Sequence, residues 1–201
     1  MTWETLFRPR WLIGWLAATG ARFYWVRRSG RRDRPETKAE AALLALAGVG
    51  NSAVPWVYFW WRGLDRAGYR LPRRLSIAAF VAGCVCDALG NWLIWRSHSD
   101  LGSNWHTVPV TTTDQTLVTS AIYRYVRHPM YAGHMLWGIG QALLLQNWIA
   151  GPAGLVTLVP LLLFRTRREE NMLAERFGDA YREYARRTGG ILPKLPGGTR
   201  R

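Results

Sequence analysis

The chain has 201 residues, enough for a single domain, and 27 basic against 13 acidic residues give it a formal charge of +14. Such a charge suits nucleic acid or an anionic membrane surface. The sequence has no basic helix interleaved with base-stacking aromatics, and its apolar residues gather in long stretches, so the membrane is expected and nucleic acid is not. Cys84 and Cys86 lie in one such stretch; we interpret them as small buried hydrophobes and expect neither a disulfide framework nor a metal site.

Five apolar segments follow one another along the chain, at residues 11–26, 39–61, 75–95, 130–148 and 151–164. About 20 apolar residues suffice to cross the hydrocarbon core of a bilayer. Several tryptophans stand at the ends of these segments, as in the aromatic belts of membrane proteins: Trp56, Trp60, Trp61, Trp92, Trp95 and Trp148. The sequence therefore predicts an all-α, multi-pass integral membrane bundle of five transmembrane helices, in the cytoplasmic (inner) membrane if the source is prokaryotic.

Local features refine this prediction. The second segment has a soft point at Asn51-Ser52 and Pro55, and the fifth helix is expected to continue into the polar tail. Residues 147–152 form a tight uncharged turn, so the last two helices should make a hairpin. We expect one domain over 1–201, with N-terminal helices in 1–95 and a cofactor-binding, catalytic half in 96–201.

Basic residues in short loops predict the orientation. The loop after the first segment, the loop before the fourth and the tail are Arg-rich, and five spans place all three on one side, which we take as cytoplasmic. The basic loop at 62–74 then falls outside. Either the rule is overridden there or the second segment does not fully cross.

Two polar residues, Asp87 and Asn91, stand one helical turn apart inside the third segment. Acids within a membrane are expensive and often functional. The alternative, which we favour, is an interhelical hydrogen bond beside Gly83 and Gly90, where helices can approach closely.

A polar, Thr-rich segment at 99–131 leads into the fourth helix through Arg127-His128-Pro129. Proline favours the first helical turn, and the free N–H groups and dipole of a helix start make an anion site. A zwitterionic cofactor with a carboxylate would fit there. The alternative is that His128 merely caps the helix and Tyr131 anchors it at the interface.

Arg165 and Glu169 stand one turn apart at the border of the fifth segment. A surface ion pair is the plain interpretation, worth roughly 0.3–0.5 kcal/mol. An arginine at the membrane surface could instead hold a carboxylate in two-pronged fashion, with Glu169 holding the guanidinium when no acceptor is bound.

Two separated motifs resemble the isoprenylcysteine carboxyl methyltransferase family, in its small prokaryotic form. The first comprises Leu117-Val118-Thr119-Ser120, Tyr123 and Arg127-His128-Pro129-Met130-Tyr131, preceded by Leu101-Gly102 and Asn104-Trp105; the second comprises Arg165, Glu169-Glu170, Phe177-Gly178, Tyr181 and Tyr184. The likeness covers roughly residues 95 to 195, and the N-terminal spans agree only in number and placement.

The resemblance implies a site for S-adenosylmethionine, built from the last two helices, the preceding loop and the C-terminal tail on the cytoplasmic side. The positions that it assigns to the cofactor are Gln115, Thr116, Leu117, Val118, Tyr123, His128, Pro129, Met130 and Tyr131. It assigns the acceptor carboxylate to Arg165 and Glu169. Gln115, Ala121 and Val108 depart from the family pattern, which leaves the adenine and ribose contacts open.

The function implied is methyl transfer from S-adenosylmethionine, giving S-adenosylhomocysteine, to the carboxylate of a prenylated cysteine or similar lipid-linked acceptor. No metal is needed; the acceptor would enter from the bilayer, and we expect a functional monomer surrounded by membrane lipids. Two alternatives stay open: a phospholipid or small-lipid amine N-methyltransferase with Glu169 as base, and a non-enzymatic membrane scaffold.

Overall fold

The computed structural model describes residues 6–29, 34–104 and 116–194, and these are helical apart from short connections, without a named strand. The α-helices are α1 (Phe7–Ser29), α2 (Lys38–Gly48), α3 (Val54–Trp60), α4 (Arg73–Leu101), α5 (Pro129–Leu145) and α6 (Ala150–Arg187). The other turns are η2 (Val49–Ala53), η3 (Arg62–Ala67), η4 (Gly102–Asn104) and η5 (Ala121–Arg124). Each predicted apolar segment is thus helical, and the all-α prediction is confirmed.

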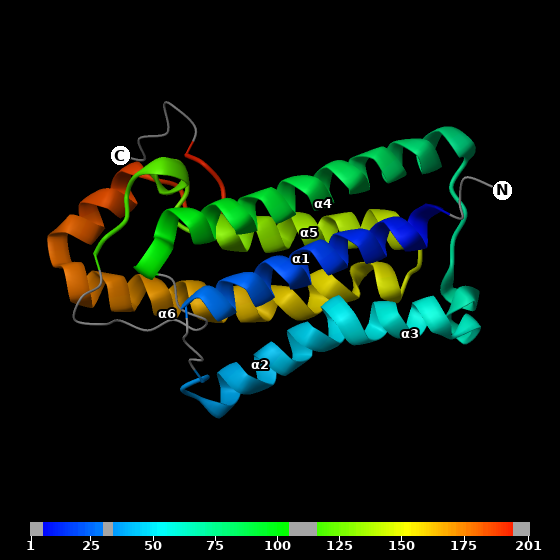
Figure 1. The fold of residues 1–201 in the computed structure, drawn as a ribbon, viewed down its shortest axis with the longest axis horizontal. Coiled ribbons are helices and arrows are strands. Elements are labelled where there is room, and N and C mark those ends of the chain that lie inside the picture. The colour runs from blue at the N-terminus through cyan, green and yellow to red at the C-terminus, as the bar shows by residue number, and fades with distance from the viewer. Residues whose placement is uncertain (1–5, 30–33, 105–115, 195–201) are drawn as a thin grey trace.

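The helices lie lengthwise in one bundle (Figure 1), in which α4, α5 and α1 pack together, α6 lies against α5, and the α2–α3 rod lies against α6. Glycines allow the closest of these contacts. A Cβ at Gly90 would lie 2.7 Å from the carbonyl oxygen of Gly133, and one at Gly133 would lie 2.8 Å from that of Gly90. The two backbones therefore touch, as the glycines of the third segment predicted.

The second segment is continuous but contains a π-turn, η2, at the predicted soft point. Its Asn51 side chain donates to the carbonyl of Ala47 (2.9 Å), and the carbonyl of Gly50 accepts from Gln141 of α5 (3.1 Å). A Cβ at Gly50 would overlap Thr157 of α6 at 2.0 Å. The wider π-turn lets α6 approach the backbone. It also lets the Gly50 carbonyl, which would accept a bond within a regular α-helix, accept from Gln141 of α5.

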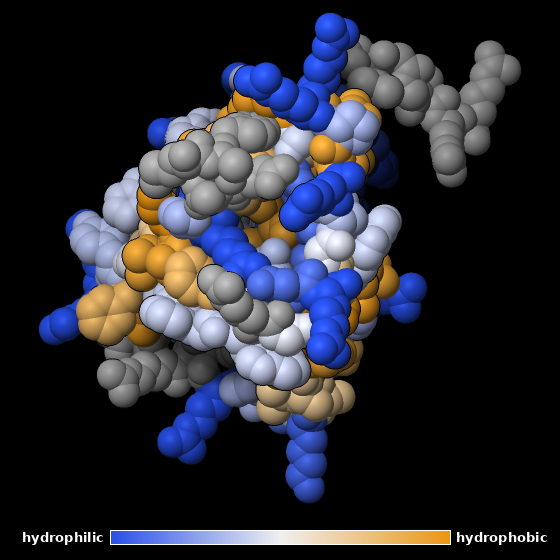
Figure 2. Space-filling view, turned by 90° about the vertical axis from the view of Figure 1, so that its right-hand side faces the viewer, coloured by the Kyte–Doolittle hydropathy of each residue, from blue (hydrophilic) through white to orange (hydrophobic). Residues whose placement is uncertain are grey.

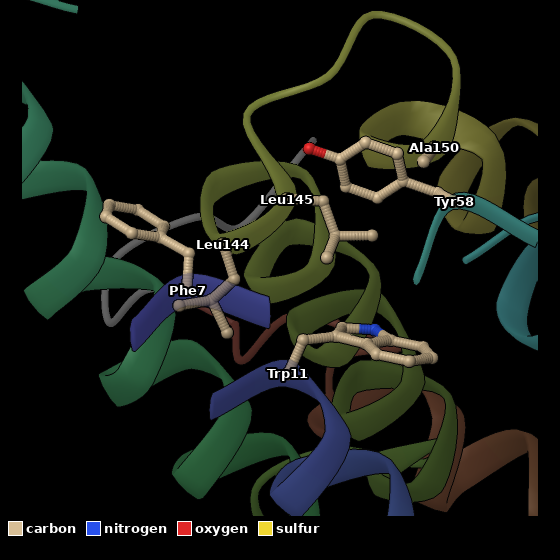
Figure 3. Packing of buried hydrophobic residues seen from close by; sticks show 6 residues of the cluster. All are labelled: Phe7, Trp11, Tyr58, Leu144, Leu145 and Ala150. Carbon is tan, nitrogen blue, oxygen red and sulfur yellow. The ribbon is translucent and has the colours of Figure 1, made fainter. Parts of the chain in front are cut away.

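A hydrophobic cluster fills the end of the bundle at which α1 begins, which we call the closed end (Figure 1). Six buried residues meet there, drawn in Figure 3: Phe7, Trp11, Tyr58, Leu144, Leu145 and Ala150. The α5–α6 turn adds polar contacts, because the buried Asn147 side chain donates to the carbonyl of Leu64 (2.8 Å) and accepts from the N–H groups of Ile149 and Ala150 (2.9 Å each). This end of the molecule is thereby fixed, and the predicted hairpin is confirmed.

The last helix continues far beyond its apolar part, as predicted, and ends at Arg187. It bends at Gly178, whose φ of +55° suits glycine and disfavours other residues. The bend turns the polar end of α6 back across the end of the bundle opposite to the chain start (Figure 1). The C-terminal segment thereby comes beside the loop that precedes α5.

Asp87 is buried and forms an ion pair with Arg10 of α1, at 2.8 Å between Nη1 and Oδ2. Asn91 donates to the carbonyl of Asp87 (2.9 Å). The favoured interpretation, an interhelical polar contact, agrees with this geometry, although the partner is a charged residue of the first segment. Cys84 packs at the edge of the apolar core, as a small hydrophobe would.

Two stretches are long and apolar enough to cross a membrane, Lys38–Trp60 and Arg73–Leu101. Much apolar surface on α4 faces outward, including Leu75, Val81, Val85, Leu89 and Trp92. Hydrophilic side chains project around the end that bears η3 and the start of α4 (Figure 2). This distribution suits a helix whose flank meets lipid and whose ends meet water, and the count of five spans stays a prediction.

Candidate active site

A cavity of about 480 Å³ occupies the end of the bundle opposite to the chain start. Its walls come from the second half of α1, from α2 and η2, from the end of α4, from the start of α5 and from the middle of α6. Apolar side chains such as Leu158, Leu161 and Leu162 line it beside charged ones. An apolar cleft with a few converging polar groups is typical of a small-molecule site.

Backbone hydrogen bonds between the start of α5 and the chain after α6 form the polar wall of the cavity. The N–H of Arg127 donates to the carbonyl of Gly189 (2.8 Å) and that of His128 to the carbonyl of Gly190 (3.1 Å). The chain after α6 therefore runs beside the chain before α5, and the two sequence motifs come together. The Tyr184 hydroxyl reinforces the pairing by donating to the carbonyl of Tyr123 (2.6 Å).

Arg127 joins the two motifs through its side chain. Its Nε and Nη2 donate to one carboxylate oxygen of Glu170, at 3.1 and 2.6 Å, and its Nη1 donates to the carbonyl of Ala185 (3.0 Å). The guanidinium is mostly buried, so these charge-assisted bonds are stronger than surface pairs. Arg127 thus acts as the clamp between the start of α5 and the polar half of α6.

His128 lies between two carboxylates. Its Nε2 is 3.1 Å from an oxygen of Glu170, and its Nδ1 is 3.3 Å from an oxygen of Glu169. The other oxygen of Glu169 accepts from the Tyr131 hydroxyl, and the Tyr131 ring stacks on the imidazole at 5.4 Å between centroids. His128 occupies the N-cap position of α5, but its side chain makes no capping bond and contacts the two carboxylates instead. Tyr131 is buried in the protein and so does not anchor the helix at the interface.

This network changes the pKa values of its members. Burial alone would lower the pKa of His128, but the hydrogen bonds and charges of Glu169 and Glu170 raise it above its ordinary value. The hydrogen bond from His128 lowers the pKa of Glu170 to about 2, against the opposing effect of burial and with further help from Arg127. The two carboxylates therefore favour the protonated form of His128 over the neutral form that burial alone would favour.

The loop before α5 is fixed at both of its described ends. Asn104 makes two bonds to Thr116, from its amide to the hydroxyl (3.1 Å) and from the Thr116 N–H to its oxygen (3.0 Å). The Asp100 carboxylate accepts from the N–H of Ile122 (3.1 Å). These contacts lie where Thr116, Leu117 and Val118 join the cavity wall.

The cavity wall contains most of the residues that the sequence singled out. These are Thr116, Leu117, Val118, Tyr123, His128, Pro129, Met130, Tyr131, Arg165 and Glu169. Gln115 lies outside the described residues. The site thus brings together the last two helices, the preceding loop and the tail, and it also includes α1 and α2, which the sequence did not indicate.

The expected pairing of Arg165 with Glu169 is wrong. Arg165 binds Glu40 of α2, with its Nε 3.1 Å and its Nη2 2.9 Å from the same oxygen, while Glu169 binds His128 and Tyr131. Only the Nε contact is a hydrogen bond; Nη2 is buried without a hydrogen-bond partner. Arg165 and Glu169 share a face of α6, but each binds residues of other helices: Arg165 binds Glu40 of α2, and Glu169 binds residues at the start of α5.

Glu40 is the residue that the sequence analysis missed. It is fully buried at the first turn of α2 and also accepts from Arg168 (3.0 Å). Thr37 caps the same turn by accepting from the Glu40 N–H (3.1 Å). The one signal in the sequence was an acid at the head of an apolar segment, because such an acid requires a cation partner.

The chain belongs to the phospholipid methyltransferase family, whose sequence model matches residues 78–180, just over half of the chain. The name of this family denotes methyl transfer to a phospholipid. The matched region includes the start of α5 and the Glu169-Glu170 pair.

Among curated proteins, the chain is similar to protein-S-isoprenylcysteine O-methyltransferases. It is 36% identical to the human protein over 119 residues, covering 58% of this chain and 42% of that protein, and 39% identical to the Rattus norvegicus protein over 118 residues, covering 58% and 42%. The chain therefore spans less than half the length of these relatives. The resemblance seen in the motifs is confirmed.

Among solved structures, the chain is similar to a eukaryotic intramembrane Ras methyltransferase, isoprenylcysteine carboxyl methyltransferase. The TM-score is 0.47 at 22% identity, covering 80% of this chain and 54% of the other.

Proposed function

We propose that the chain is an integral membrane methyltransferase that uses S-adenosylmethionine to methylate the carboxylate of a prenylated cysteine or a similar lipid-linked acceptor. The observation that carries this proposal is the one cavity in which the start of α5, the Glu169 carboxylate and Arg165 meet. The curated relatives bear the name of this reaction.

The residues of the cavity fit S-adenosylmethionine. A volume of about 480 Å³ lies within the range of roughly 300–1,000 Å³ found for small-molecule sites. The first turn of α5 leaves the N–H groups of Met130 and Tyr131 without helical acceptors, which suits a carboxylate. Glu169 offers negative charge to the cationic part, and Thr116, Leu117 and Val118 offer backbone and apolar surface.

When bound, the cofactor supplies an activated methyl group, so the chain has to bind the cofactor and the acceptor, orient them towards each other and exclude water. The Arg127–Glu170 clamp fixes the start of α5 against α6, and His128 and Tyr131 fix Glu169. Tyr123 and Pro129 close the wall around them. A carboxylate acceptor is ionised at neutral pH, and no general base is required.

Arg165 is the residue that we assign to the acceptor. Its Nε is held by Glu40, which sets the plane of the guanidinium, and its buried Nη2 has no hydrogen-bond partner. A carboxylate at Nη2 would satisfy that donor. Glu169, one turn further along α6, then marks the boundary between the acceptor side and the cofactor side of the cavity.

The acceptor enters from the lipid in this proposal. The start of α1 and η3 lie at one end of the bundle, and the start of α5 and the described C-terminal segment, which contribute to the cavity, lie at the other (Figure 1). Five crossings with the cavity end in the cytoplasm would give a soluble cofactor access from water and a lipidated acceptor access from the bilayer. We propose a functional monomer, because both sequence motifs lie in the α5–α6 hairpin and its flanks and pair with each other there.

The test is methyl transfer by the purified protein in detergent or nanodiscs. Radiolabelled S-adenosylmethionine is supplied with N-acetyl-S-farnesyl-cysteine, with its carboxamide analogue, or with phosphatidylethanolamine. We expect label in the farnesylcysteine ester alone. Binding of the cofactor without transfer to any acceptor would favour the scaffold alternative.

A second candidate is N-methylation of a phospholipid amine, which the family description favours. This reaction needs a base to take the ammonium proton, and Glu169 is the carboxylate on the cavity wall. Label in phosphatidylethanolamine, and none in the farnesylcysteine, would establish it in place of the carboxylate reaction.

A further inference from the structure

Arg22 stands in the second half of α1, within the apolar segment at 11–26, and its exposed side chain lines the same cavity as Arg165 and His134. A guanidinium on a helix within a membrane bundle is expensive unless it is paired, and such residues mark ligand paths. In the ranges that the structure describes, Arg10, Arg127, Arg165 and Arg168 each have a carboxylate partner, and Arg22 has no such ion pair.

The charges around Arg22 leave it uncompensated. Arg165 and Arg168 share Glu40, and Arg168 also binds Glu36. On the other side of the cavity, Arg127 binds Glu170, and His128 contacts both Glu169 and Glu170. Arg165 of α6 lines the same cavity as Arg22 and carries the same charge, so the two guanidiniums repel each other.

Small residues of α1 and α2 line the cavity beside Arg22. α1 packs on α4 and α5, whereas α2 packs on α6. Both α1 and α2 contribute small residues to the cavity wall, Ala18 and Thr19 from α1 and Ala47 and Gly48 from α2. One hydrogen bond, from the Trp15 indole to the Ser52 hydroxyl (3.0 Å), joins the helices nearer the closed end.

We propose that Arg22 is a specificity-determining residue that binds the acceptor's carboxylate together with Arg165. The anion would give the Arg165 guanidinium a second acceptor beside Glu40, neutralise Arg22 and reduce the repulsion between the two guanidiniums. An uncharged lipid of the same shape leaves both unsatisfied, so Arg22 selects anionic acceptors over neutral ones. This inference rests on the proposed function for the chemical identity of the acceptor. The negative charge of the acceptor is inferred from Arg22 and Arg165 themselves.

The experiment measures binding to the full chain in nanodiscs for two matched ligand pairs. They are N-acetyl-S-farnesyl-cysteine with its carboxamide, and palmitate with palmitamide. The proteins are wild type, Arg22→Gln, Arg22→Lys and the control Arg27→Gln, because Arg27 lies on the same helix with its guanidinium 5.2 Å from the Phe23 ring. Affinity for S-adenosylmethionine is measured in each as a check of the folded state.

We expect wild type and Arg27→Gln to prefer the anion of the farnesyl pair by roughly tenfold or more. Arg22→Gln should abolish this preference with unchanged cofactor affinity, and Arg22→Lys should retain part of it. An anion preference that survives in Arg22→Gln overturns the inference, and so does its absence from wild type in both pairs. A preference for palmitate alone, abolished in Arg22→Gln, supports Arg22 while the proposed prenylcysteine acceptor fails.

Discussion

His128 illustrates how much chemistry a single side chain carries at this site. It contacts both Glu169 and Glu170, and its ring stacks on Tyr131. The sequence predicted the importance of the Arg127-His128-Pro129 start from helix-end chemistry and from resemblance. It could not predict that the histidine lies between two carboxylates, because these are more than forty residues away in the chain.

We predict that His128→Ala and Tyr131→Phe weaken cofactor binding more than they weaken folding. Both changes release Glu169 from a position that we assign to the cofactor's cationic part, and the loss of a charge-assisted contact should reduce affinity roughly tenfold. Calorimetric titration with S-adenosylmethionine in detergent measures this. Tyr125→Phe is the control, because that ring is exposed. Unchanged affinity in both test variants would remove these residues from the cofactor site.

The same network predicts a dependence of stability on pH. The lowered pKa of Glu170 stabilises the fold fully above the ordinary value of 4.5, and this contribution is lost as pH falls towards about 2. The raised pKa of His128 stabilises it fully below the ordinary value of 6.5, and this is lost as pH rises through the raised value. We therefore expect the highest unfolding temperature between these two ordinary values. His128→Gln should flatten the alkaline side of the profile; an unchanged slope there would contradict the assignment.

The conservative replacement of Arg165 by lysine tests whether the planar guanidinium is needed. Arg165→Lys should lose most turnover, roughly tenfold or more, because an ammonium cannot hold Glu40 through one donor while offering a second, coplanar donor to the acceptor. Cofactor affinity should stay near wild type. Turnover and cofactor titration are measured beside Arg167→Lys, an exposed neighbour on α6. Full activity in Arg165→Lys would exclude Arg165 from the site.

The ion pair between α1 and α4 matters at the scale of the element. Asp87 is buried against Arg10, and a Cβ at Gly14 would lie 2.3 Å from its carboxylate oxygens, so the two helices touch around the charge. Asp87→Ala leaves Arg10 without its partner and should destabilise the fold by roughly 3–5 kcal/mol. Reversible unfolding in mixed micelles measures this.

The double variant Arg10→Leu with Asp87→Leu separates this mechanism from simple loss of packing. It removes both charges, so we expect it to recover much of the lost stability. If the effects of the single variants add, the two side chains do not act as a pair.

The sequence predicted most of the helices and several features of how they connect. Hydrophobic runs predicted the helices, the turn residues predicted the α5–α6 hairpin, and Asn51 and Pro55 predicted the irregularity that proved to be η2. Glycines in the third segment predicted close packing, but their partner Gly133 could not be identified, since helix pairing depends on contacts across the whole bundle. The π form of η2 follows from α6 and Gln141 pressing on the same turn.

For the whole molecule, the sequence predicted a single helical unit with a site in its C-terminal half, and the structure adds α1 and α2 to that site. The reason is physical: Arg165 is a buried cation and requires an anion, and the nearest part of the fold that supplies one is the head of α2, at Glu40. Long-range charge pairing of this kind has no periodic signal in a sequence. The motifs indicated the cavity residues in the C-terminal half, including Arg165 and Glu169, whereas the contributions of α1 and α2 became visible only in the folded chain.

The count of five spans makes a prediction about which side of the membrane each end faces. Arg66 in η3 is exposed at the end shown in Figure 2, and Arg182 is exposed beyond the bend of α6 at the opposite end. With Cys84 and Cys86 replaced by alanine, Arg66→Cys and Arg182→Cys should react with a membrane-impermeant maleimide from opposite sides of sealed vesicles. Arg182→Cys should be reached from the cytoplasmic side, because Arg-rich segments flank the cavity end. The basic η3 loop would then oppose the rule, held outside by its contacts with the α5–α6 turn, such as that of Leu64 with Asn147. Labelling of both cysteines from the same side would show that the second segment does not cross.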